Sequence, residues 1–465
     1  MKKQVPRFIL KYAHSVAKSF SPYAQLLARA KIKVPRAPSQ AWFESLPVTS
    51  KESYIKPLSL KKIVAFSNPE VVYASSGSSG SSTFWFRDEK TVQDGADLHR
   101  FLFEQVFGIK RGEPTLVIVT FGMGLWIAGS FTADVCRALR RVGFVVSVAT
   151  PGIEEKDIRS VLRTLGPAYR HIVIAGYPPF LLDIVRRFTM DTDDVITHPS
   201  LFILTAGDKH SEEWRAEMQT LIGRPGADNR VINLYGSAEA GPMAFETPKT
   251  ISLRRKALRD ASVREQIFAG QGGLGGLFNY LPKQVYFECA GEELLITKVM
   301  PVPLVRYNTH DRGVLHVGED FKRKKGRFSW EQLPLVAVSG RTDVALTLYA
   351  LNMYPEHLAI TLPEHFTGSY LAFTRTEPGP VSERLVFAVE LKQGATPSTY
   401  DTEGIREAVV ARLLLHNSEY RKLHGDLGTI SEPAIELFPY GELPQKGKDR
   451  ALLCIHGKKP RIVFA

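Results

Sequence analysis

Short apolar runs alternate with helical patterns between about residues 70 and 240, and this rhythm limits the folds that the chain can adopt. The runs are rich in β-branched residues and indicate buried strands over 116–120, 144–148, 171–174, 201–204 and 231–234. Apolar residues at helical spacing predict helices over 126–142, 156–165, 179–188 and 212–222. Strands that alternate with helices predict an α/β fold with a large, doubly wound, mostly parallel sheet.

Polar or Gly-rich turns follow the carboxyl ends of three predicted strands. They are FGMG at 121–124, AGD at 206–208 and YGSAE at 235–239. In an open parallel sheet, ligands bind in the crevice beyond the carboxyl ends of the strands. We therefore expect these turns to border a ligand site.

The pattern changes after residue 270, and this change indicates the domain organisation. A Gly-rich stretch, GQGGLGG, precedes short alternating segments such as 284–288 and 293–297, which predict a β-rich part over about 270–339. The turn Gly340-Arg341-Thr342-Asp343 separates two apolar runs. We therefore expect a large domain over 1–339, with a helical lead-in over 1–70, and a small mobile α+β lid domain over 340–465, with a hinge near 340–343.

Composition argues against a disulfide-rich or zinc-binding protein. The 465 residues are 44% hydrophobic, as in ordinary globular chains. Cys136, Cys289 and Cys454 lie far apart without a CxxC pair, and the twelve histidines are scattered. This pattern favours a reducing compartment, so we expect a cytoplasmic protein.

The net charge of +12 attracts anions, but the charge is spread along the chain without a nucleic-acid motif. We expect phosphate-bearing small molecules and no nucleic acid as partners. No run of about eighteen apolar residues occurs, which predicts no transmembrane segment. The basic, amphipathic first 33 residues favour a helix that caps the main domain, and a membrane-surface helix is the alternative.

The stretch YASSGSSGSSTFWFR at 73–87 has the composition of a flexible linker. It lies, however, between two apolar segments that are expected to pair as a hairpin. A loop of small residues lets a ligand approach the backbone closely and offers N–H groups and hydroxyls to phosphates. Its position therefore favours phosphate contact. It is not a P-loop, because Gly80 is followed by Ser81 and Ser82 and not by Lys and Ser/Thr.

Eight motifs between residue 47 and about residue 450 resemble, in the same order, those of the phenylacetate–coenzyme A ligase branch of the adenylate-forming enzymes. The loop resembles that branch's ASSGTTGKPT, and PLVRYNTHD resembles its PLIRYRTxD. In full, the eight are PVTSK (47–51), ASSGSSGSST (74–83), LTAGD (204–208), YGSAE (235–239), PLVRYNTHD (303–311), GRTD (340–343), LNMYP (351–355) and LPQKGK (443–448).

The resemblance implies a two-step ligase that uses ATP, Mg²⁺ and coenzyme A. A small-molecule carboxylic acid would attack the α-phosphate of ATP to give an acyl-adenylate and pyrophosphate. The C-terminal domain would then rotate, and an acceptor, usually coenzyme A, would take the acyl group. The branch is commonly dimeric, so a homodimer is a further implication.

The resemblance also implies roles for single residues. Lys448 would be catalytic, since its cation would stabilise the charge that builds on the phosphate oxygens. Glu239 would help to hold Mg²⁺, and Asp311 would accept both ribose hydroxyls. The acyl group would contact Met123, Trp126, Gly207 and Tyr235. The nucleotide would contact Ser75, Ser76, Gly77, Ser78, Ser79, Gly80, Thr83, Ala206, Gly207, Asp208, Asn233, Leu234, Tyr235, Gly236, Ser237, Asp311 and Arg341.

Each residue also has a structural interpretation without function. Glu239 could be a carboxylate at a helix N-terminus, where the helix dipole favours a negative charge. Asp311 and Arg341 could form a surface ion pair, which contributes little to stability. Lys446 and Lys448 are also typical of a solvated tail, and Lys446 competes with Lys448 for the catalytic role.

Two departures from the family pattern lower the expected efficiency. Ser81 and Ser82 replace the loop's lysine and proline, which removes a cation from the triphosphate site. Ala238 replaces a Ser or Thr before Glu239, and the neighbouring Ser237 is a candidate to compensate. Loss of one charged hydrogen bond costs about 1.5–3 kcal/mol, which slows adenylation without abolishing it.

Three functions therefore stay open. The first is ligation of an aryl or acyl acid to coenzyme A. In the second, the adenylate passes to an amine, a carrier protein or a reductase partner. The third is a degenerate protein that binds an adenylate without turnover.

Overall fold

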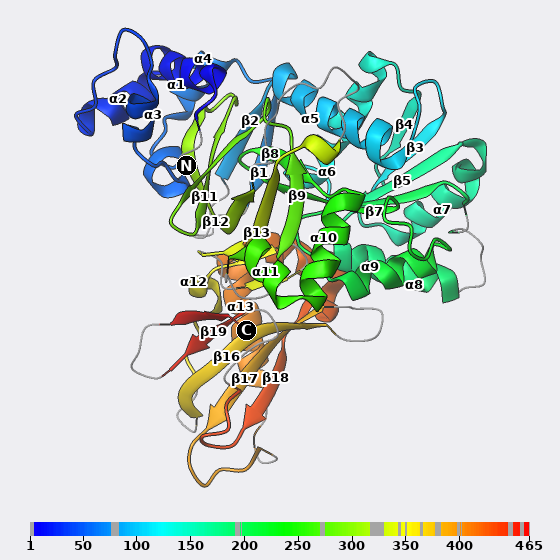
Figure 1. Ribbon diagram of the computed structural model, residues 1–465. Coiled ribbons are helices and arrows are strands. Elements are labelled where there is room, and N and C mark those ends of the chain that lie inside the picture. The colour runs from blue at the N-terminus through cyan, green and yellow to red at the C-terminus, as the bar shows by residue number, and fades with distance from the viewer. Residues whose placement is uncertain are drawn as a thin grey trace.

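The structure is a computed structural model that describes residues 4–75, 83–190, 196, 198–269, 275–316, 330–342, 346–348, 351–362, 366–376, 383–397, 400, 402–444, 450–455 and 460–464. Most of the Gly/Ser loop (76–82) and the segment with Lys446 and Lys448 lie outside these ranges. The chain forms a large upper part and a smaller lower part in Figure 1.

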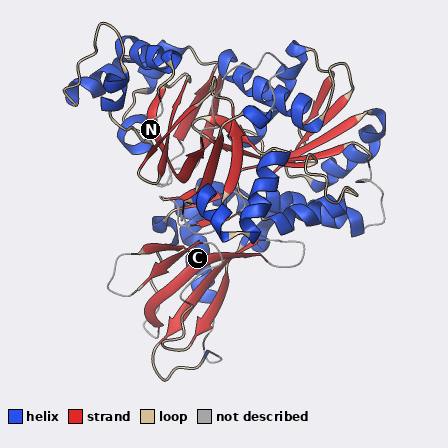
Figure 2. Cartoon of the chain, viewed as in Figure 1, coloured by secondary structure: helices blue, strands red, loops and turns tan. Residues whose placement is uncertain are grey.

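Five parallel strands, hydrogen-bonded in the order β4-β3-β5-β6-β7, form one half of the large sheet. Helices cover both faces of this half (Figure 2). Val117 and Val119 face a core with α5 and α6, whereas Leu116 and Ile118 face a second core with α7, α8 and α9. The predicted doubly wound sheet is therefore confirmed. The elements are β3 (Thr115–Val119), β4 (Val146–Ala149), β5 (His171–Gly176), β6 (Leu201–Ala206), β7 (Val231–Ser237), α5 (Glu89–Phe101), α6 (Ile127–Ala138), α7 (Glu155–Leu165), α8 (Pro178–Met190) and α9 (Glu212–Leu221).

Antiparallel strands extend the same sheet to eleven strands, in the order β10-β11-β12-β13-β9-β8-β7 and onward. The β-rich part predicted over 270–339 is present, but its strands continue the parallel sheet instead of forming a separate one. The elements are β8 (Gly241–Phe245), β9 (Gly276–Tyr280), β10 (Tyr286–Ala290), β11 (Glu293–Lys298), β12 (Leu304–His316), β13 (Leu335–Arg341), α10 (Pro248–Arg259) and α11 (Ala261–Phe268).

The segments on either side of the Gly/Ser-rich stretch pair as a hairpin, as the sequence predicted. Strands β1 (Val71–Ser75) and β2 (Thr83–Arg87) pair antiparallel, and Ser75 stands opposite Thr83 at the loop end. The residues at 75 and 83 are therefore cross-strand partners, which is not the arrangement expected at the two ends of a linker between domains.

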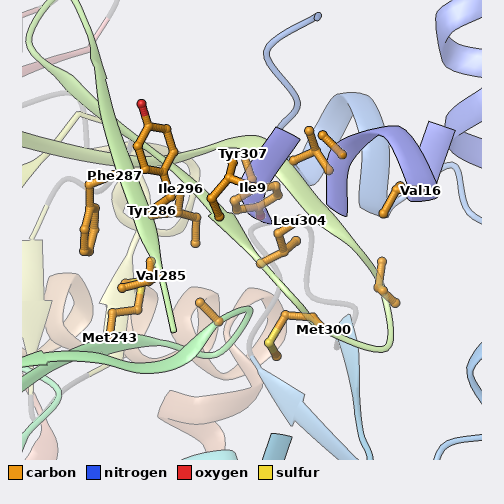
Figure 3. Close-up of a cluster of buried hydrophobic side chains, with 14 of the residues drawn as sticks. Ile9, Val16, Met243, Val285, Tyr286, Phe287, Ile296, Met300, Leu304 and Tyr307 are labelled. Carbon is orange, nitrogen blue, oxygen red and sulfur yellow. The ribbon is translucent and has the colours of Figure 1, made fainter. Parts of the chain in front are cut away.

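The N-terminal helices pack on the antiparallel half of the sheet, which confirms the capping helix predicted there. Ile9 and Val16 of α1 are buried in one cluster with Leu304 and Tyr307 of β12 (Figure 3). Tyr12 of α1 also donates its hydroxyl to the Lys298 carbonyl oxygen at 3.0 Å. The elements are α1 (Arg7–Ser19), α2 (Ser21–Arg29), α3 (Gln40–Ser45), a π-helical turn (Lys51–Ile55) and α4 (Leu60–Ser67).

The C-terminal part forms a second, five-stranded sheet in the order β18-β17-β16-β19-β20. Its core includes Phe387 of β17 and Leu413 of α13. The hinge predicted near 340–343 falls at the carboxyl end of β13, and the domain boundary there remains a prediction. The elements are β14 (Leu346–Leu348), β15 (Leu351–Met353), α12 (Pro355–Leu358), β16 (Phe366–Thr376), β17 (Glu383–Leu391), α13 (Glu403–His416), α14 (Ser418–Leu427), β18 (Ala434–Phe438), β19 (Arg450–Cys454) and β20 (Arg461–Phe464).

The three cysteines are free thiols in the structure. Cys136 and Cys454 are buried, and Cys289 is exposed. Among the helices that the structure describes, none combines the length and the apolar character that crossing a membrane requires.

Two neighbouring residues of α1 test how the N-terminal helix is held. Ile9 is 3% exposed and Phe8 is 45% exposed. We expect Ile9→Ala to lower the free energy of unfolding by about 2–5 kcal/mol, because it leaves a cavity in the cluster of Figure 3. The control Phe8→Ala should change it by less than about 0.5 kcal/mol. Urea unfolding followed by intrinsic fluorescence measures both, and equal effects would contradict the packing described.

Candidate active site

A cavity of about 470 Å³ lies where the strand ends, α6 and the small domain meet. Most of the described residues predicted to bind nucleotide line this one cavity, although they come from motifs more than a hundred residues apart. They are Ala206, Gly207, Asp208, Asn233, Leu234, Tyr235, Gly236, Ser237, Asp311 and Arg341, joined by Trp126 and Glu239. These residues therefore border one cavity at the carboxyl ends of the strands, and the binding role predicted for them stays a prediction.

Strand pairing places Asp311 beside Arg341. The two residues are cross-strand partners in the antiparallel pair β12 and β13. The Arg341 Nη1 lies 4.0 Å from the Asp311 Oδ1, and Asp311 is 5% exposed. The pair is thus largely withdrawn from water and lines the cavity, so the interpretation as a surface ion pair does not apply.

Tyr235 is fixed by both ends of its side chain. Its ring stacks on Phe278 of β9, with ring centroids 5.6 Å apart. Its hydroxyl donates to the Asp311 Oδ2 at 2.5 Å. Burial, followed by the Asp311 charge, raises the pKa of Tyr235 well above its usual value, so the hydroxyl keeps its proton. The carboxylate of Asp311 retains lone pairs for further donors.

Buried polar residues hold the turn at 206–208 in place. The Asn233 amide donates to the Asp208 carbonyl oxygen at 2.9 Å, and Asn233 accepts from the Thr205 hydroxyl at 3.1 Å. The Asn233 backbone N–H donates to Glu246, which is paired at 2.7 Å with the fully buried Arg215. This turn also uses a left-handed conformation at Gly207, with φ +96°, which favours glycine. The turn is therefore rigidly attached to β7.

Two buried basic side chains hold the turn that carries Glu239. Arg87, at the end of β2, donates to the carbonyl oxygens of Ala238 at 2.5 Å and Glu239 at 3.2 Å. Lys298 donates to those of Ala240 at 2.6 Å and Pro242 at 2.8 Å. Carbonyl groups that accept from these side chains are satisfied without water, so the turn keeps one shape.

The Glu239 side chain faces the cavity between Tyr307 and Lys51. Its Oε1 lies 3.5 Å from the Tyr307 hydroxyl. Burial lowers the pKa of Lys51, and the Glu239 charge raises it in part. Within the described ranges, no group of three or more His, Cys, Asp or Glu residues is positioned to hold a metal. A single carboxylate still fits Mg²⁺ where phosphate oxygens supply other ligands.

Some predicted residues lie elsewhere. Thr83 is at the end of β2 and does not line the cavity, and Ser75 is at the end of β1. Met123 does not line it either, because its side chain packs toward Gly129 and Gly152. The other loop residues Ser76, Gly77, Ser78, Ser79 and Gly80, and the catalytic candidate Lys448, fall outside the described residues.

Several cavity residues were not predicted. Lys51 lines the cavity because its segment pairs with β12, where the Thr49 N–H donates to the Arg306 carbonyl oxygen at 3.1 Å. The motif PVTSK (47–51), which contains Lys51, could have indicated this residue from the sequence. Tyr177 places its hydroxyl 3.4 Å from Asp208 and 3.2 Å from Glu383 of the small domain. No motif marks Tyr177, nor the cavity residues His99, Leu423 and Leu427, whereas the cavity residue Tyr354 belongs to the motif at 351–355.

No protein-family model matches the chain, and no curated protein matches it by sequence. Solved structures do match its fold. The 2-hydroxyisobutyryl-CoA ligase with 2-HIB-AMP and CoA, in the thioesterification state, has a TM-score of 0.66 at 15% identity over 95% of this chain and 88% of that chain. The same ligase gives 0.54 in the postadenylation state with R3-HIB-AMP, at 15% identity over 94% and 86%. Its open conformation also gives 0.54, at 15% identity over 94% and 88%.

These matches define the class of the fold. The chain has the two-part fold of the adenylate-forming ligases, and its cavity lies at the carboxyl ends of the parallel strands. One of the solved structures that it resembles is a 2-hydroxyisobutyryl-CoA ligase.

The buried Lys298 gives a pH-dependent test of the Glu239 turn. Burial, followed by the Arg87 charge, lowers the pKa of Lys298 to about 7. Between this value and the ordinary lysine pKa, the unfolded chain binds more protons than the folded one, so this residue makes stability rise with pH. We expect the stability lost in Lys298→Met to grow from pH 7 to pH 9, by up to about 1.4 kcal/mol per pH unit.

Urea unfolding at pH 7, 8 and 9 measures this difference. The exposed Lys283 supplies the control, and Lys283→Met should follow the wild-type pH dependence. A loss in Lys298→Met that is constant over this range would show that Lys298 is not desolvated as described.

Proposed function

We propose that the protein is an ATP-dependent carboxylate ligase that forms an acyl-adenylate and transfers the acyl group to coenzyme A. One observation carries the proposal. Side chains from the motifs shared with adenylate-forming enzymes converge on a single cavity, with an aspartate–arginine pair at one side and a carboxylate at the other. The fold supports it, because it is that of ligases that carry out this reaction.

The nucleotide half of the cavity fits adenosine monophosphate. Asp311 has an ionised carboxylate that accepts from both ribose hydroxyls, and Arg341 beside it stabilises that charge. The turn Ala206-Gly207-Asp208 and the Tyr235 ring supply a flat, partly apolar surface for the adenine. Because Tyr235 is already bonded to Asp311, it positions the carboxylate in addition to contacting the base.

The phosphate half combines cations with hydrogen-bond donors. Lys51 lines the cavity and supplies a positive charge there, whereas the Gly/Ser loop lacks the lysine of the family pattern. The Ser237 hydroxyl accepts from the Ala240 N–H at 3.2 Å and keeps its own proton to donate to the α-phosphate, which supports its substitution for the hydroxyl missing at Ala238. Glu239 would hold Mg²⁺ together with phosphate oxygens. The ion would neutralise charge on the leaving pyrophosphate.

Two kinds of molecule are candidates for the acceptor of the acyl group. The thioester-forming ligase that this chain resembles binds CoA, which favours coenzyme A. Transfer to an amine, a carrier protein or a reductase partner is the alternative carried by the sequence. Homodimer formation and a cytoplasmic location remain predictions from the sequence.

A panel of carboxylic acids tests the reaction. The purified protein is mixed with ATP, Mg²⁺ and each acid, and pyrophosphate release is followed with and without coenzyme A. Thioester formation by mass spectrometry would support the proposal. Pyrophosphate release without a thioester would favour another acceptor. ATP binding with no release for any acid would favour a protein that binds an adenylate without turnover.

Asp311 gives a test that does not require the acid. We expect Asp311→Asn to weaken ATP binding at least about tenfold, because it replaces a charged acceptor for the ribose hydroxyls. Isothermal titration measures the affinity. Glu292→Gln is the matched control, since the exposed Glu292 pairs with Arg312 on the same hairpin and does not line the cavity, and it should bind ATP like the wild type. Equal affinities for all three proteins would remove Asp311 from the nucleotide site.

Lys448 gives a test of the adenylation step. We expect Lys448→Ala to reduce pyrophosphate release at least about tenfold while ATP binding is retained, because the cation stabilises charge only in the transition state. Lys446→Ala is the control, and its rate should stay near that of the wild type. If instead only Lys446→Ala is slow, the catalytic role belongs to Lys446.

A further inference from the structure

A buried histidine lies on the cavity wall away from the nucleotide residues. His99 belongs to α5, is 2% exposed and lines the cavity beside Phe131 and Val135 of α6. Along α6 the cavity runs from the partly exposed Trp126 to the fully buried Val135. His99 therefore lies at the buried, largely apolar end of the cavity, whereas Asp311 and Arg341 lie on the β12–β13 pair.

The hydrogen bond of one ring nitrogen determines what the other can do. The His99 Nδ1 lies 2.9 Å from the Gly95 carbonyl oxygen. A carbonyl oxygen only accepts, so Nδ1 carries the proton. Burial lowers the pKa of His99 to about 4, so the ring is neutral at pH 7. The His99 Nε2 is then an acceptor with a free lone pair.

This acceptor has no hydrogen-bond partner among the residues that the structure describes. Phe131 and Val135, which line the same cavity, have apolar side chains that cannot donate to it. A buried acceptor without a partner is unfavourable, and most such groups in folded proteins are satisfied. The partner is therefore to be sought in the cavity itself.

We propose that the acid substrate carries a hydroxyl or N–H donor on the part of its acyl group remote from the carboxylate, and that this donor binds the Nε2 of His99. The inference rests on the proposed function, because it takes the buried end of the cavity as the acyl site. His99 is then a specificity-determining residue: an acid with a donor pairs with Nε2, and an acid without one leaves Nε2 unsatisfied. Sites that hydrogen-bond a substrate group discriminate strongly against analogues that lack it.

Pairs of acids that differ only by hydroxyl against fluorine test the proposal. The pairs are 4-hydroxy- and 4-fluorophenylacetate, 3-hydroxy- and 3-fluorobenzoate, and 6-hydroxy- and 6-fluorohexanoate. Each acid is assayed for kcat/KM in pyrophosphate release, and its N-acylsulfamoyl adenosine is assayed for affinity by titration. We expect the hydroxylated member of at least one pair to be preferred at least about fivefold in both measurements.

The variant His99→Leu removes the acceptor and should reduce this preference to about one. His99→Gln keeps an acceptor and should retain part of the preference, which also covers the case in which the leucine variant does not fold. His14→Leu, outside the cavity, is the control and should keep the wild-type preference. A purely structural His99 would change stability and overall activity but not the ratio within a pair.

The outcomes separate this proposal from the proposed function. Pyrophosphate release with no preference for any hydroxylated acid, or a preference that His99→Leu leaves unchanged, overturns the role of His99 but keeps the ligase. Failure of every acid and every adenosine analogue to react or bind overturns both. Preferential binding of hydroxylated analogues without pyrophosphate release supports His99 and contradicts the ligase.

Discussion

The hydrogen bond between Tyr235 and Asp311 joins two strands that are far apart in the sheet. Three strands, β8, β9 and β13, lie between β7 and β12. Adjacent strands are about 4.8 Å apart, so a flat sheet would separate the two strands by about 19 Å, beyond the joint reach of the two side chains. The sheet must therefore curve around the cavity. The contact of Tyr235 with Phe278 of β9 lies inside this curve and supports it.

Buried charges in this protein mainly position backbone. Arg87, Lys298 and Arg215 each donate to carbonyl oxygens of the turns and strands that border the cavity. Arg215 is also paired with Glu246, so its charge is compensated, which a buried ion requires. Some of the basic residues that make the net charge positive therefore stabilise the backbone inside the fold. The net charge alone consequently gives little information on which partners the protein binds.

The sequence predicted the parts of the fold that depend on local pattern. The β-α rhythm from 70 to 240 and the hairpin around the Gly/Ser loop follow from residue spacing and are present. The single continuous sheet was not predictable from the sequence. Strand β9 pairs with β13, and the periodicity of a segment predicts a strand but not which other strand it pairs with. Among the residues that line the cavity, the motifs contain Asp311, Tyr235 and Glu239. His99 was missed because a lone histidine in a helical pattern has no signature until α5 is packed against α6.

The strand β2 connects the base of the Gly/Ser loop with the turn that carries Glu239. Thr83 stands at the base of the Gly/Ser loop, and Arg87, at the other end of the same short strand, holds the carbonyl oxygens of the Glu239 turn. A five-residue strand that is paired along its whole length is stiff, and its two ends stay about 13 Å apart. A shift at the base of the loop would consequently be transmitted to the turn that carries Glu239, so the shape of that turn depends on how the base of the loop is held.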